Sequence, residues 1–567
     1  MFGYKKKTRV VAISLLIFTM AFASACSSNN EAGKQSTPTS SAENSGTGGE
    51  SSVEPDNAEP SAKYDPKIVV TAVRGLDQTI KFHTGESIDN NDWSRAYEDE
   101  LGIKVNYLWT ADGSQYDTKL NLAIASGDLP DIIPVNQFTL QRLIDADLVA
   151  DLTDVFEKYA TPKTKEVLNS DDGYALKDAT FKGKLMALPN IIGGVESGDV
   201  IFIREDWRKK LNLPEPHTMD DVLRISEAFT KQDPDGNGKP DTYGLALSKE
   251  LLNGITGLMG LFNGYHAYPN NWVEDESGKL VYGSTRPEVK NALQTLQNMF
   301  KSGQIDPEFA VKSSEKASEL TVSGKVGMHY SQWWIPYIPL NKSVETDPKA
   351  EWKAYPIVSA DDKTAYAVGG RSAYTFYAVN KKSQHPEAAI KLLNLYNEKW
   401  GKAENSEKFF FGTDINKADY ALLMSTPSGK NIKTQQAIKQ ALETKDTSIL
   451  KQVGESEIDY ANVKKYLDGD HSLQLWSKYM VYGPEGSLGV LAKYIEENKY
   501  VFDKFTGPST PTMLEKNAML NDLQNQMFTK IIMGAASADE FDSFVDQWNK
   551  LGGDKITQEV NDWFASR

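Results

Sequence analysis

The sequence predicts an α/β protein, because short apolar runs alternate with longer amphipathic patterns along most of the chain. The first such pair is the strand-like run IVVTAV at 68–73, followed by the helical pattern WSRAYEDELG at 93–102. Alternation of this kind is typical of βαβ units and a largely parallel sheet. The 567 residues are enough for two or more ordinary domains, or for one large body with two lobes.

The expected elements follow one another from residue 67 onward. A strand at 103–110 is followed by an amphipathic helix at 116–127 that ends at a glycine, and then by the short buried strand DIIPV at 131–135. Further strands are expected at 199–204, at 325–330 and on both sides of Gly369 and Gly370, and further helices at 219–232, 281–303, 386–397, 433–451, 513–534 and 538–553. Ligands of such sheets bind outside the carboxyl ends of the strands, which favours the loops 83–93 and 135–139.

Composition excludes several kinds of site. The single cysteine rules out a disulfide framework and any thiolate-rich zinc or iron–sulfur site. With 78 Asp and Glu against 62 Lys and Arg, the net charge is -16, which argues against nucleic acid as a partner because phosphate binding needs a positive field. Hydrophobic content of 40%, with 10% aromatic residues, predicts a globular body.

The N-terminus has the pattern of an export signal. Basic residues at 5–9 precede the apolar run 10–25 and then Cys26. The alternative is a membrane-spanning helix, but that needs about 20 apolar residues and this run is shorter. Residues 27–62 are rich in Ser, Gly and Glu and cannot bury enough apolar surface to offset their conformational entropy, so we expect a flexible tether; the alternative is a dispensable tail.

The residues just before Cys26 resemble a bacterial lipobox. They read Ala23-Ser24-Ala25, with Ala23 where the pattern prefers Leu. The resemblance implies that 1–25 is a lipoprotein signal peptide, that Cys26 becomes the lipidated N-terminus, and that 26–62 is a lipid-anchored tether.

Several ordered stretches carry a resemblance to a known family. They are ASGDLPDII (125–133), IREDWRKKLNLP (203–214), DPDGNGKPDTYGL (233–245), GKVGMHYSQWW (324–334), FTGPSTPTM (505–513) and DEFDSFVDQWNKLGGDKITQEVNDWF (539–564). In this order they resemble the extracellular solute-binding proteins of carbohydrate ABC importers, family 1, and in particular the large Gram-positive lipoproteins related to alginate-binding proteins.

The resemblance implies a class II periplasmic-binding-protein fold, in which two α/β lobes enclose a cleft and are joined by crossing strands. Lobe 1 would comprise 63–195 and a return at 366–395, and lobe 2 would begin with 196–365. The mainly helical remainder, 396–567, would belong mostly to lobe 2.

The same resemblance implies a receptor held at the extracellular face of a Gram-positive cell membrane. It would capture an oligosaccharide and deliver it to the permease subunits of an ABC importer, touching the membrane through its N-terminal lipid only. We expect a monomer. We also expect no enzymatic activity, because no nucleophile elbow, HExxH, Walker loop or Rossmann glycine pattern appears. Two alternatives stay open: a lipid-anchored glycoside hydrolase acting through paired carboxylates, and a receptor for peptides or cell-wall fragments.

The segment DPDGNGKPD at 233–241 predicts a structural calcium loop. Oxygen side chains occupy positions 1, 3, 5 and 9 of an EF-hand-like spacing, and Gly238 at position 6 permits the sharp turn. The expected ligands are Asp233, Asp235, Asn237, the backbone carbonyl of Lys239, and Asp241. Gly244 stands at position 12 in place of a bidentate Glu, so the last ligand is not identified. The alternative is a metal-free turn, since Asp, Asn and Gly favour turns.

Aromatic and amide side chains mark an expected sugar site, because a pyranose needs a flat aromatic face and polar partners for its hydroxyls. The expected residues are Asn90, Asn91, Trp93, Asn136, Gln137, Tyr330, Trp333, Trp334 and Arg371. One of the adjacent Trp333 and Trp334 is expected to face the cleft and the other the core. As a ligand residue, Arg371 would contact a hydroxyl or a uronic carboxylate.

Each of these residues has a structural alternative. Trp93 can instead be a hydrophobe at a helix cap, Trp334 a core residue, and Arg371 part of a hinge salt bridge. We assign three other tryptophans, Trp207, Trp548 and Trp563, to packing rather than to the site.

Overall fold

The computed structural model describes residues 59–565 apart from 77–79, 411–415, 454 and 508. The expected signal peptide, Cys26 and nearly all of the expected tether lie outside the described residues. In the described part of the chain, every helix is too short or too polar to cross a lipid bilayer.

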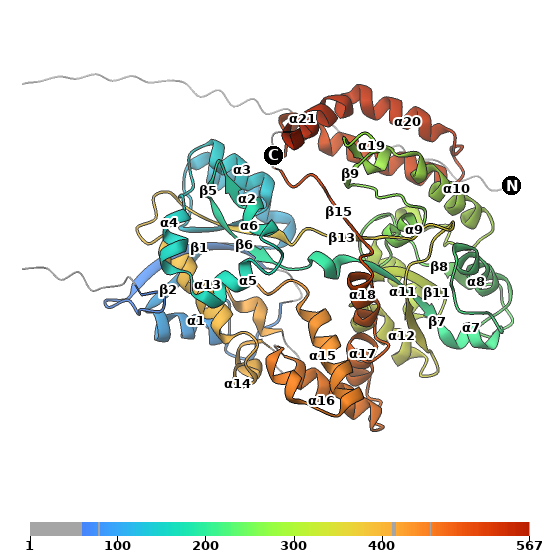
Figure 1. The fold of residues 1–567 in the computed structure, drawn as a ribbon, viewed down its shortest axis with the longest axis horizontal. Coiled ribbons are helices and arrows are strands. Elements are labelled where there is room, and N and C mark those ends of the chain that lie inside the picture. Colours follow the sequence, from blue (N-terminus) through green and yellow to red (C-terminus); the bar gives the residue numbers. More distant parts are fainter. Residues whose placement is uncertain (1–58, 77–79, 411–415, 454, 508, 566–567) are drawn as a thin grey trace, which may run out of the picture. The chain divides into compact units, whose positions relative to one another are not determined.

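The first sheet has five strands in the order β2-β1-β3-β14-β6 (Figure 1). Its strands are β1 (Ile68–Gly75), β2 (Ile103–Ala111), β3 (Ile132–Val135), β6 (Ala187–Ile191) and β14 (Ala373–Val379). β1 runs parallel to β2 and β3, whereas β14 runs antiparallel to β3 and β6. The parallel part agrees with the βαβ pattern of the sequence, and β14 is the strand that returns from the second half of the chain.

Helices of the first lobe surround this sheet. They are α1 (Asp92–Ala96), α2 (Gly113–Ser126), α3 (Gln137–Asp145), α4 (Thr153–Tyr159), α5 (Pro162–Leu168), α6 (Tyr174–Asp178), α13 (Glu387–Lys399) and α14 (Ala403–Asn405), with a small hairpin of β4 (Thr180–Phe181) and β5 (Lys184–Leu185). The helix expected at 93–102 is α1 followed by a π-helical turn, and it ends at Gly102 with φ 66°. A positive φ at this position favours glycine, as the sequence indicated.

The second sheet has four strands in the order β12-β7-β11-β8. Its strands are β7 (Asp199–Arg204), β8 (Tyr243–Leu245), β11 (Val326–Gln332) and β12 (Trp352–Tyr355). The helices that accompany it are α7 (Glu205–Lys210), α8 (Met219–Lys231), α9 (Met259–Gly264), α10 (Pro287–Lys301), α11 (Ser314–Val322) and α12 (Asn341–Thr346). A hairpin of β9 (Trp272–Glu274) and β10 (Leu280–Tyr282) belongs to the same part of the chain. The central strand β7 is buried along nearly its whole length, as expected for DVIFIR.

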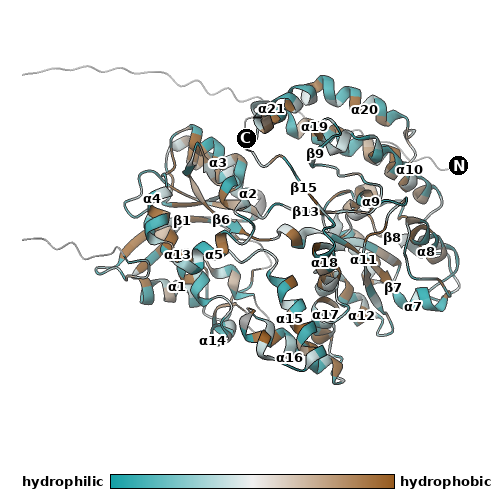
Figure 2. Cartoon of the chain, viewed as in Figure 1, coloured by the Kyte–Doolittle hydropathy of each residue, from teal (hydrophilic) through white to brown (hydrophobic). Residues whose placement is uncertain are grey.

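Each sheet has its own hydrophobic core, which establishes two α/β lobes. Trp93, Ile133 and Phe376 belong to the first core, and Phe202 and Phe229 to the second. Figure 2 shows hydrophobic residues along the strands, and mixed hydrophilic and hydrophobic faces on outer helices such as α16 and α20.

The first core extends further along the chain than residue 395, where we expected the return to lobe 1 to end. Phe409, Phe410 and Leu423 are buried in it. The reason is aromatic packing, since both phenylalanines contact Trp93 at centroid distances of 4.9 and 5.5 Å.

The remaining helices belong to the second core. They are α15 (Lys430–Thr444), α16 (Ser456–Leu467), α17 (Leu473–Tyr482), α18 (Ser487–Glu496), α19 (Pro511–Ile532), α20 (Glu540–Trp548) and α21 (Asp554–Ala565). Their apolar faces carry buried residues such as Ile438, Leu491 and Phe528.

Three stretches of chain connect the lobes: one between β6 and β7, one between β12 and β14, and one between Leu423 of the first core and Ile432 of the second. The second of these contains β13 (Ala367–Gly369), which pairs in parallel with β15 (Tyr500–Phe502), the strand between α18 and α19 of the second lobe. The packing is tight: a Cβ on Gly369 would lie 2.2 Å from the Phe502 ring, and one on Gly370 2.4 Å from the Ser197 hydroxyl. Only glycine allows this close approach of the crossing strands.

The first described residues are held against the first lobe by Lys391 of α13. This lysine has no exposed surface, and its ammonium donates hydrogen bonds to the carbonyl oxygens of Ala62 (2.8 Å) and Glu59 (3.2 Å). The rings of Tyr64 and Tyr159 lie 4.9 and 5.6 Å from the same nitrogen. The body of the protein therefore begins at a fixed point on α13.

Candidate functional site

Arg371 connects both lobes at the crossing strands. Its Nη1 donates a hydrogen bond to the side-chain oxygen of Gln137, and its Nη2 donates one to the carbonyl oxygen of Phe505 at 3.2 Å. Gln137 is the first residue of α3, directly after the carboxyl end of β3. The guanidinium thus lies at the edge of the first sheet where ligands of α/β proteins bind.

A pocket of about 340 Å³ lies next to Arg371, and we call it the Arg371 pocket. Its lining residues come from the 270–282 region, the crossing region and the C-terminal helices: Asn270, Trp272, Tyr282, Arg371, Asp503, Phe505, Gly507, Ser509, Met513, Asn517, Leu520, Asn521, Trp548 and Ile556. Aromatic rings, amides and a charged pair therefore meet in one concave site, the combination that binds polar ligands with apolar faces.

The aromatic wall of the Arg371 pocket is a set of packed rings. Tyr282 stacks on Trp548 with centroids 5.0 Å apart and planes 10° apart, and Trp272 lies 5.3 Å from Tyr282. Phe505 closes the set at 6.4 Å from Trp272. Burial raises the pKa of Tyr282 to about 12, so this phenol stays neutral and can serve as a hydrogen-bond donor.

The polar side of the pocket is built around Asp503. One carboxylate oxygen, Oδ1, accepts hydrogen bonds from the backbone N–H groups of Trp272 (3.1 Å) and Phe505 (3.0 Å). The other, Oδ2, makes no hydrogen bond with a residue of the described chain. Burial raises the pKa of Asp503, and the nearby charge of Arg371 acts in the opposite direction.

Two amide-bearing surfaces complete the pocket. The Asn270 Oδ1 accepts hydrogen bonds from Tyr282 (3.1 Å) and Gln524 (3.0 Å), so its amide nitrogen is the group turned to other partners. Asn517 and Asn521 are exposed and lie one turn apart on α19. Amides of this kind can donate to and accept from sugar hydroxyls.

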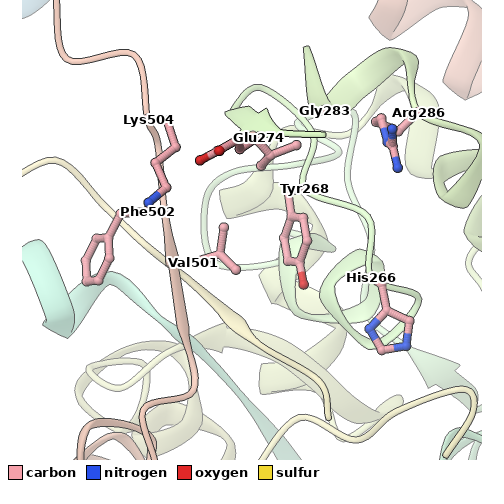
Figure 3. Close-up of a pocket in the computed structure, with 9 residues that line it drawn as sticks. His266, Tyr268, Glu274, Gly283, Arg286, Val501, Phe502 and Lys504 are labelled. Atoms are coloured by element: carbon pink, nitrogen blue, oxygen red, sulfur yellow. The ribbon is translucent and has the colours of Figure 1, made fainter. Parts of the chain in front are cut away.

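A second pocket, of about 290 Å³, lies on the other side of the 501–505 segment, and we call it the Lys504 pocket. In Figure 3, Val501 of this segment points toward the loop that carries Tyr268 and His266, and Phe502 and Lys504 also line the pocket. His266 is bonded to Asp361 at 2.9 Å. Successive residues of the 501–505 segment therefore line different pockets, with Lys504 in this one and Asp503 in the Arg371 pocket.

Of the expected sugar-site residues, the structure brings together Gln137 and Arg371. Asn136, next to Gln137, is exposed and caps α3 through a 2.8 Å hydrogen bond from the Thr139 N–H to its side chain. Asn90 is also exposed, but its side chain is occupied by Arg95 (3.0 Å) and the Gly85 carbonyl (3.2 Å). Asn90 therefore belongs to the closed loop before α1.

Three expected site residues are buried, which corrects their assignment to a ligand surface. Trp93 has no exposed surface, and its indole N–H donates to the carbonyl oxygens of Phe409 (2.9 Å) and Lys417 (3.1 Å). Asn91 is equally buried and caps α1, and Tyr330 is 1% exposed within the second core. A buried side chain whose polar atoms are already bonded offers no face to a sugar, so we do not carry these residues into the site.

Trp333 and Trp334 follow β11 and are both half-buried against the second core. The Trp334 indole N–H donates to the Gln332 side chain at 2.8 Å, and the Trp333 carbonyl accepts from Ser487 at 2.7 Å. No hydrogen bond or ring contact in the described chain joins either tryptophan to Arg371. The two tryptophans are therefore separate from the Arg371 pocket.

The expected calcium loop has its oxygens directed at protein hydrogen-bond donors. The Asp233 carboxylate accepts from the N–H groups of Asn237 and Gly238, both at 3.0 Å. The ammonium of Lys325 lies 2.6 Å from Asp241 and 3.7 Å from Asp235. Among the described residues, no group of three or more His, Cys, Asp or Glu is arranged to hold a metal ion.

Sequence reasoning missed most of the Arg371 pocket. Trp548 was assigned to helix packing, which is correct for its buried ring (4% exposed) but leaves out the edge that lines the pocket. Asp503 lies in a segment with no recognisable motif. Only its place next to FTGPSTPTM, one of the stretches that carry the family resemblance, was a usable signal.

Comparison with known proteins identifies the family. Residues 86–401 match the model of the family described as bacterial extracellular solute-binding protein. Lipoprotein LipO of Bacillus subtilis is 24% identical over 490 residues, covering 83% of this chain and 88% of LipO. The polygalacturonan/rhamnogalacturonan-binding protein YtcQ of the same organism is 24% identical, covering 81% and 85%.

Solved structures agree with this fold. The Streptococcus pneumoniae ABC-transporter substrate-binding protein FusA in complex with kestose has a TM-score of 0.60 at 18% identity, covering 88% of this chain and all of FusA. The structure of a FusA EF-hand mutant gives a TM-score of 0.58 at 17% identity, with the same coverage. The family match, the two α/β lobes and the crossing strands agree, and the chain belongs to the bacterial extracellular solute-binding protein family.

Proposed function

We propose that this protein captures an oligosaccharide in the Arg371 pocket and delivers it to the permease of an ABC importer. The observation that carries the proposal is the pocket itself, which joins stacked aromatic rings to amides and a charged pair beside the crossing strands. Relatives named for binding polygalacturonan, rhamnogalacturonan or fructooligosaccharide support a carbohydrate ligand.

The physical argument has two parts. The aromatic side chains of the pocket offer apolar contact to the C–H groups of pyranose or furanose rings, whereas the sugar hydroxyls need donors and acceptors such as Asn270, Asn517 and Asn521. Arg371 bridges Gln137 of the first lobe and the 503–505 segment, so a ligand bound there would alter contacts of both lobes. Ligand-dependent closure about the crossing strands would then signal the loaded state to the importer.

The test is calorimetric titration of purified protein with neutral and acidic oligosaccharides. Asn517→Ala and Asn521→Ala should each weaken binding by about 5- to 100-fold, the loss expected for one or two hydrogen bonds. Asn525→Ala is the matched control, because Asn525 is exposed on the same helix but does not line the pocket. Unchanged affinity in both pocket variants would place the ligand elsewhere.

The same incubation distinguishes a receptor from a glycoside hydrolase. A receptor binds one equivalent and returns the sugar intact, whereas product formation on chromatography would support the hydrolase. Binding of peptides or muropeptides, with none of the oligosaccharides bound, would support the third alternative.

We also propose that the mature chain is held at the extracellular face of the cell membrane through a lipid on Cys26. The lipobox-like residues before Cys26 and the similarity to a Bacillus lipoprotein support this. Cys26→Ser should move the protein from the membrane fraction to the medium, and detergent phase partitioning of the two forms would measure the change. Retention of the Cys26→Ser protein in the membrane would contradict lipid anchoring.

Finally, we propose that the 233–241 loop binds calcium as a structural ion. Carboxylate and amide oxygens of Asp233, Asp235, Asn237 and Asp241 are the donor type that calcium prefers, and an EF-hand mutant has been prepared for the structural relative FusA. The ion would add positive charge to a loop in which the ammonium of Lys325 now lies beside Asp235 and Asp241.

A further inference from the structure

The charges that line the Arg371 pocket define which sugars it accepts. Arg371 and Asp503 are the only charged side chains among its lining residues in the described chain. One is positive and the other negative, and the charge of Arg371 favours the ionised form of the Asp503 carboxylate. A pocket with a balanced pair offers no net attraction to an ion.

Arg371 is also committed to protein partners. Its Nη1 and Nη2 already donate to the Gln137 side chain and the Phe505 carbonyl, respectively. Recognition of a carboxylate by arginine usually uses two parallel hydrogen bonds from the guanidinium fork. Here one N–H of each terminal nitrogen already holds Gln137 of the first lobe or the Phe505 carbonyl of the second, which fixes the guanidinium in place and leaves fewer of its five N–H groups for a ligand.

Asp503 differs from Arg371. Its carboxylate is held in place, but only one of its two oxygens is hydrogen-bonded to the described residues. Its Oδ1 is held by the backbone N–H groups of Trp272 and Phe505, which prevents the carboxylate from turning away. Its Oδ2 makes no hydrogen bond with the described residues, and Asp503 is one of the residues that line the pocket. An unoccupied anionic acceptor binds a hydroxyl well and repels a second carboxylate.

We infer that the Arg371 pocket selects neutral oligosaccharides, with Asp503 accepting a hydrogen bond from a sugar hydroxyl and excluding uronic acids. This inference rests on the proposed function and gives its substrate class. It also decides between the two roles considered for Arg371: the guanidinium positions the lobes and Asp503 rather than pairing with a uronic carboxylate.

The other pocket provides an internal control. Lys504, adjacent to Asp503 in sequence, lines the Lys504 pocket with Arg286 and His266. An acidic ligand attracted by the charges of Lys504 and Arg286 would depend on Lys504 and not on Asp503. Variants of the two neighbouring residues therefore separate the two sites.

The experiment compares the galacturonic acid trimer with its full methyl ester, which has the same ring and hydroxyl pattern but no charge, alongside maltotriose, xylotriose and inulotriose. Calorimetry on the full mature chain should show binding of one or more neutral probes. The acid trimer should bind at least tenfold more weakly than its methyl ester. Asp503→Asn, which retains an acceptor for the two backbone N–H groups, should reduce that ratio at least tenfold, whereas Lys504→Gln should leave it unchanged.

Equal or tighter binding of the acid trimer by the unmodified protein would overturn the inference while leaving the oligosaccharide function intact. A ratio that changes in Lys504→Gln but not in Asp503→Asn would also overturn it and would move the acidic site to the Lys504 pocket. Failure of every probe to bind would count against the oligosaccharide function itself. If Asp503→Asn does not fold, the comparison of acid and ester on the unmodified protein decides the question alone.

Discussion

Glu196 holds the N-terminus of α15 through Asn431. Its Oε1 accepts the Asn431 backbone N–H at 2.7 Å and its Oε2 accepts the Asn431 side-chain amide at 2.8 Å, with the Ile432 N–H at 3.3 Å. Glu196 lies in the stretch that crosses from β6 to β7, so this contact ties the hinge region to a helix of the second core.

Replacing Glu196 by Ala should lower the free energy of unfolding by about 2 kcal/mol. The reason is that the variant leaves the first N–H groups of α15 without acceptors in a buried place, since Glu196 is only 6% exposed. Chemical denaturation measures the change. Glu166→Ala is the control, because Glu166 is exposed and its ion pair with Lys163 should contribute less than 1 kcal/mol. Equal stability of the two variants would mean that α15 does not depend on this cap.

Asp199 should make stability depend on pH near the start of β7. Burial raises the pKa of Asp199 to about 6, and the 2.9 Å hydrogen bond that its carboxylate accepts from the Gly260 N–H acts in the opposite direction. Between about pH 4 and 6 the folded protein keeps a proton that the unfolded chain has released, so the Asp199 contribution to the free energy of unfolding falls as pH rises through this window. Asp199→Asn removes this dependence and should be more stable than the unmodified protein at pH 7, by at most about 3 kcal/mol.

The measurement must be the difference between Asp199→Asn and the unmodified protein. Burial lowers the pKa of His329 to about 4, which by itself makes stability rise with pH between about 4 and 6.5. Subtraction cancels His329, because both proteins contain it. A difference that stays constant from pH 4 to 7 would show that Asp199 titrates at its ordinary pKa.

Trp93 should matter for folding and not for ligand affinity. Trp93→Ala removes a ring packed against Tyr396 at 5.3 Å and two hydrogen bonds, and it should cost about 3–5 kcal/mol of stability. Denaturation gives the stability, and calorimetry below the transition gives the affinity of the folded fraction. A stable Trp93→Ala protein that has lost sugar binding would restore Trp93 to the ligand site.

Calcium should stabilise the protein, and Lys325 should oppose it. A chelator is expected to lower the melting temperature by about 2 °C or more, since an ion that binds the folded state adds its binding free energy to stability. Lys325→Met removes the ammonium beside Asp241 and should tighten calcium binding, whereas Lys316→Met, at an exposed residue of α11, should not. An unchanged melting temperature, together with no calcium in elemental analysis, would exclude the site.

The sequence was sufficient to predict the architecture because local patterns carry it. DVIFIR at 199–204 is strand β7 with the same bounds, and the helix at 219–232 is α8 with a capping box at Thr218. Strands and helices were predicted correctly where the buried residues alternate along the chain or recur with a 3.6-residue period. They also gave the glycine ends of helices, as at Gly102.

The site was harder to predict, because its residues are polar or aromatic in segments up to 286 residues apart, from Asn270 to Ile556. Trp93 is an example of a residue that was predicted to lie in the site but does not. A tryptophan on a strand-to-helix loop is expected to be accessible, but here Phe409 and Phe410, which are far along the chain, cover its ring. Gln137 and Arg371 were predicted because both lie where strands of the fold end or cross, and the structure brings their side chains into contact. Their contact itself depends on side-chain geometry that a linear pattern does not contain.

The hydrogen bonds of Lys391 determine which part of the folded protein would bear a force applied to the N-terminal chain. Because the carbonyls of Glu59 and Ala62 are fastened to this buried ammonium, a pull on the preceding chain reaches α13 and the first core before any other element. The second lobe would bear none of that load directly. In a receptor anchored through this segment, the first lobe would stay fixed and the second lobe would move relative to it.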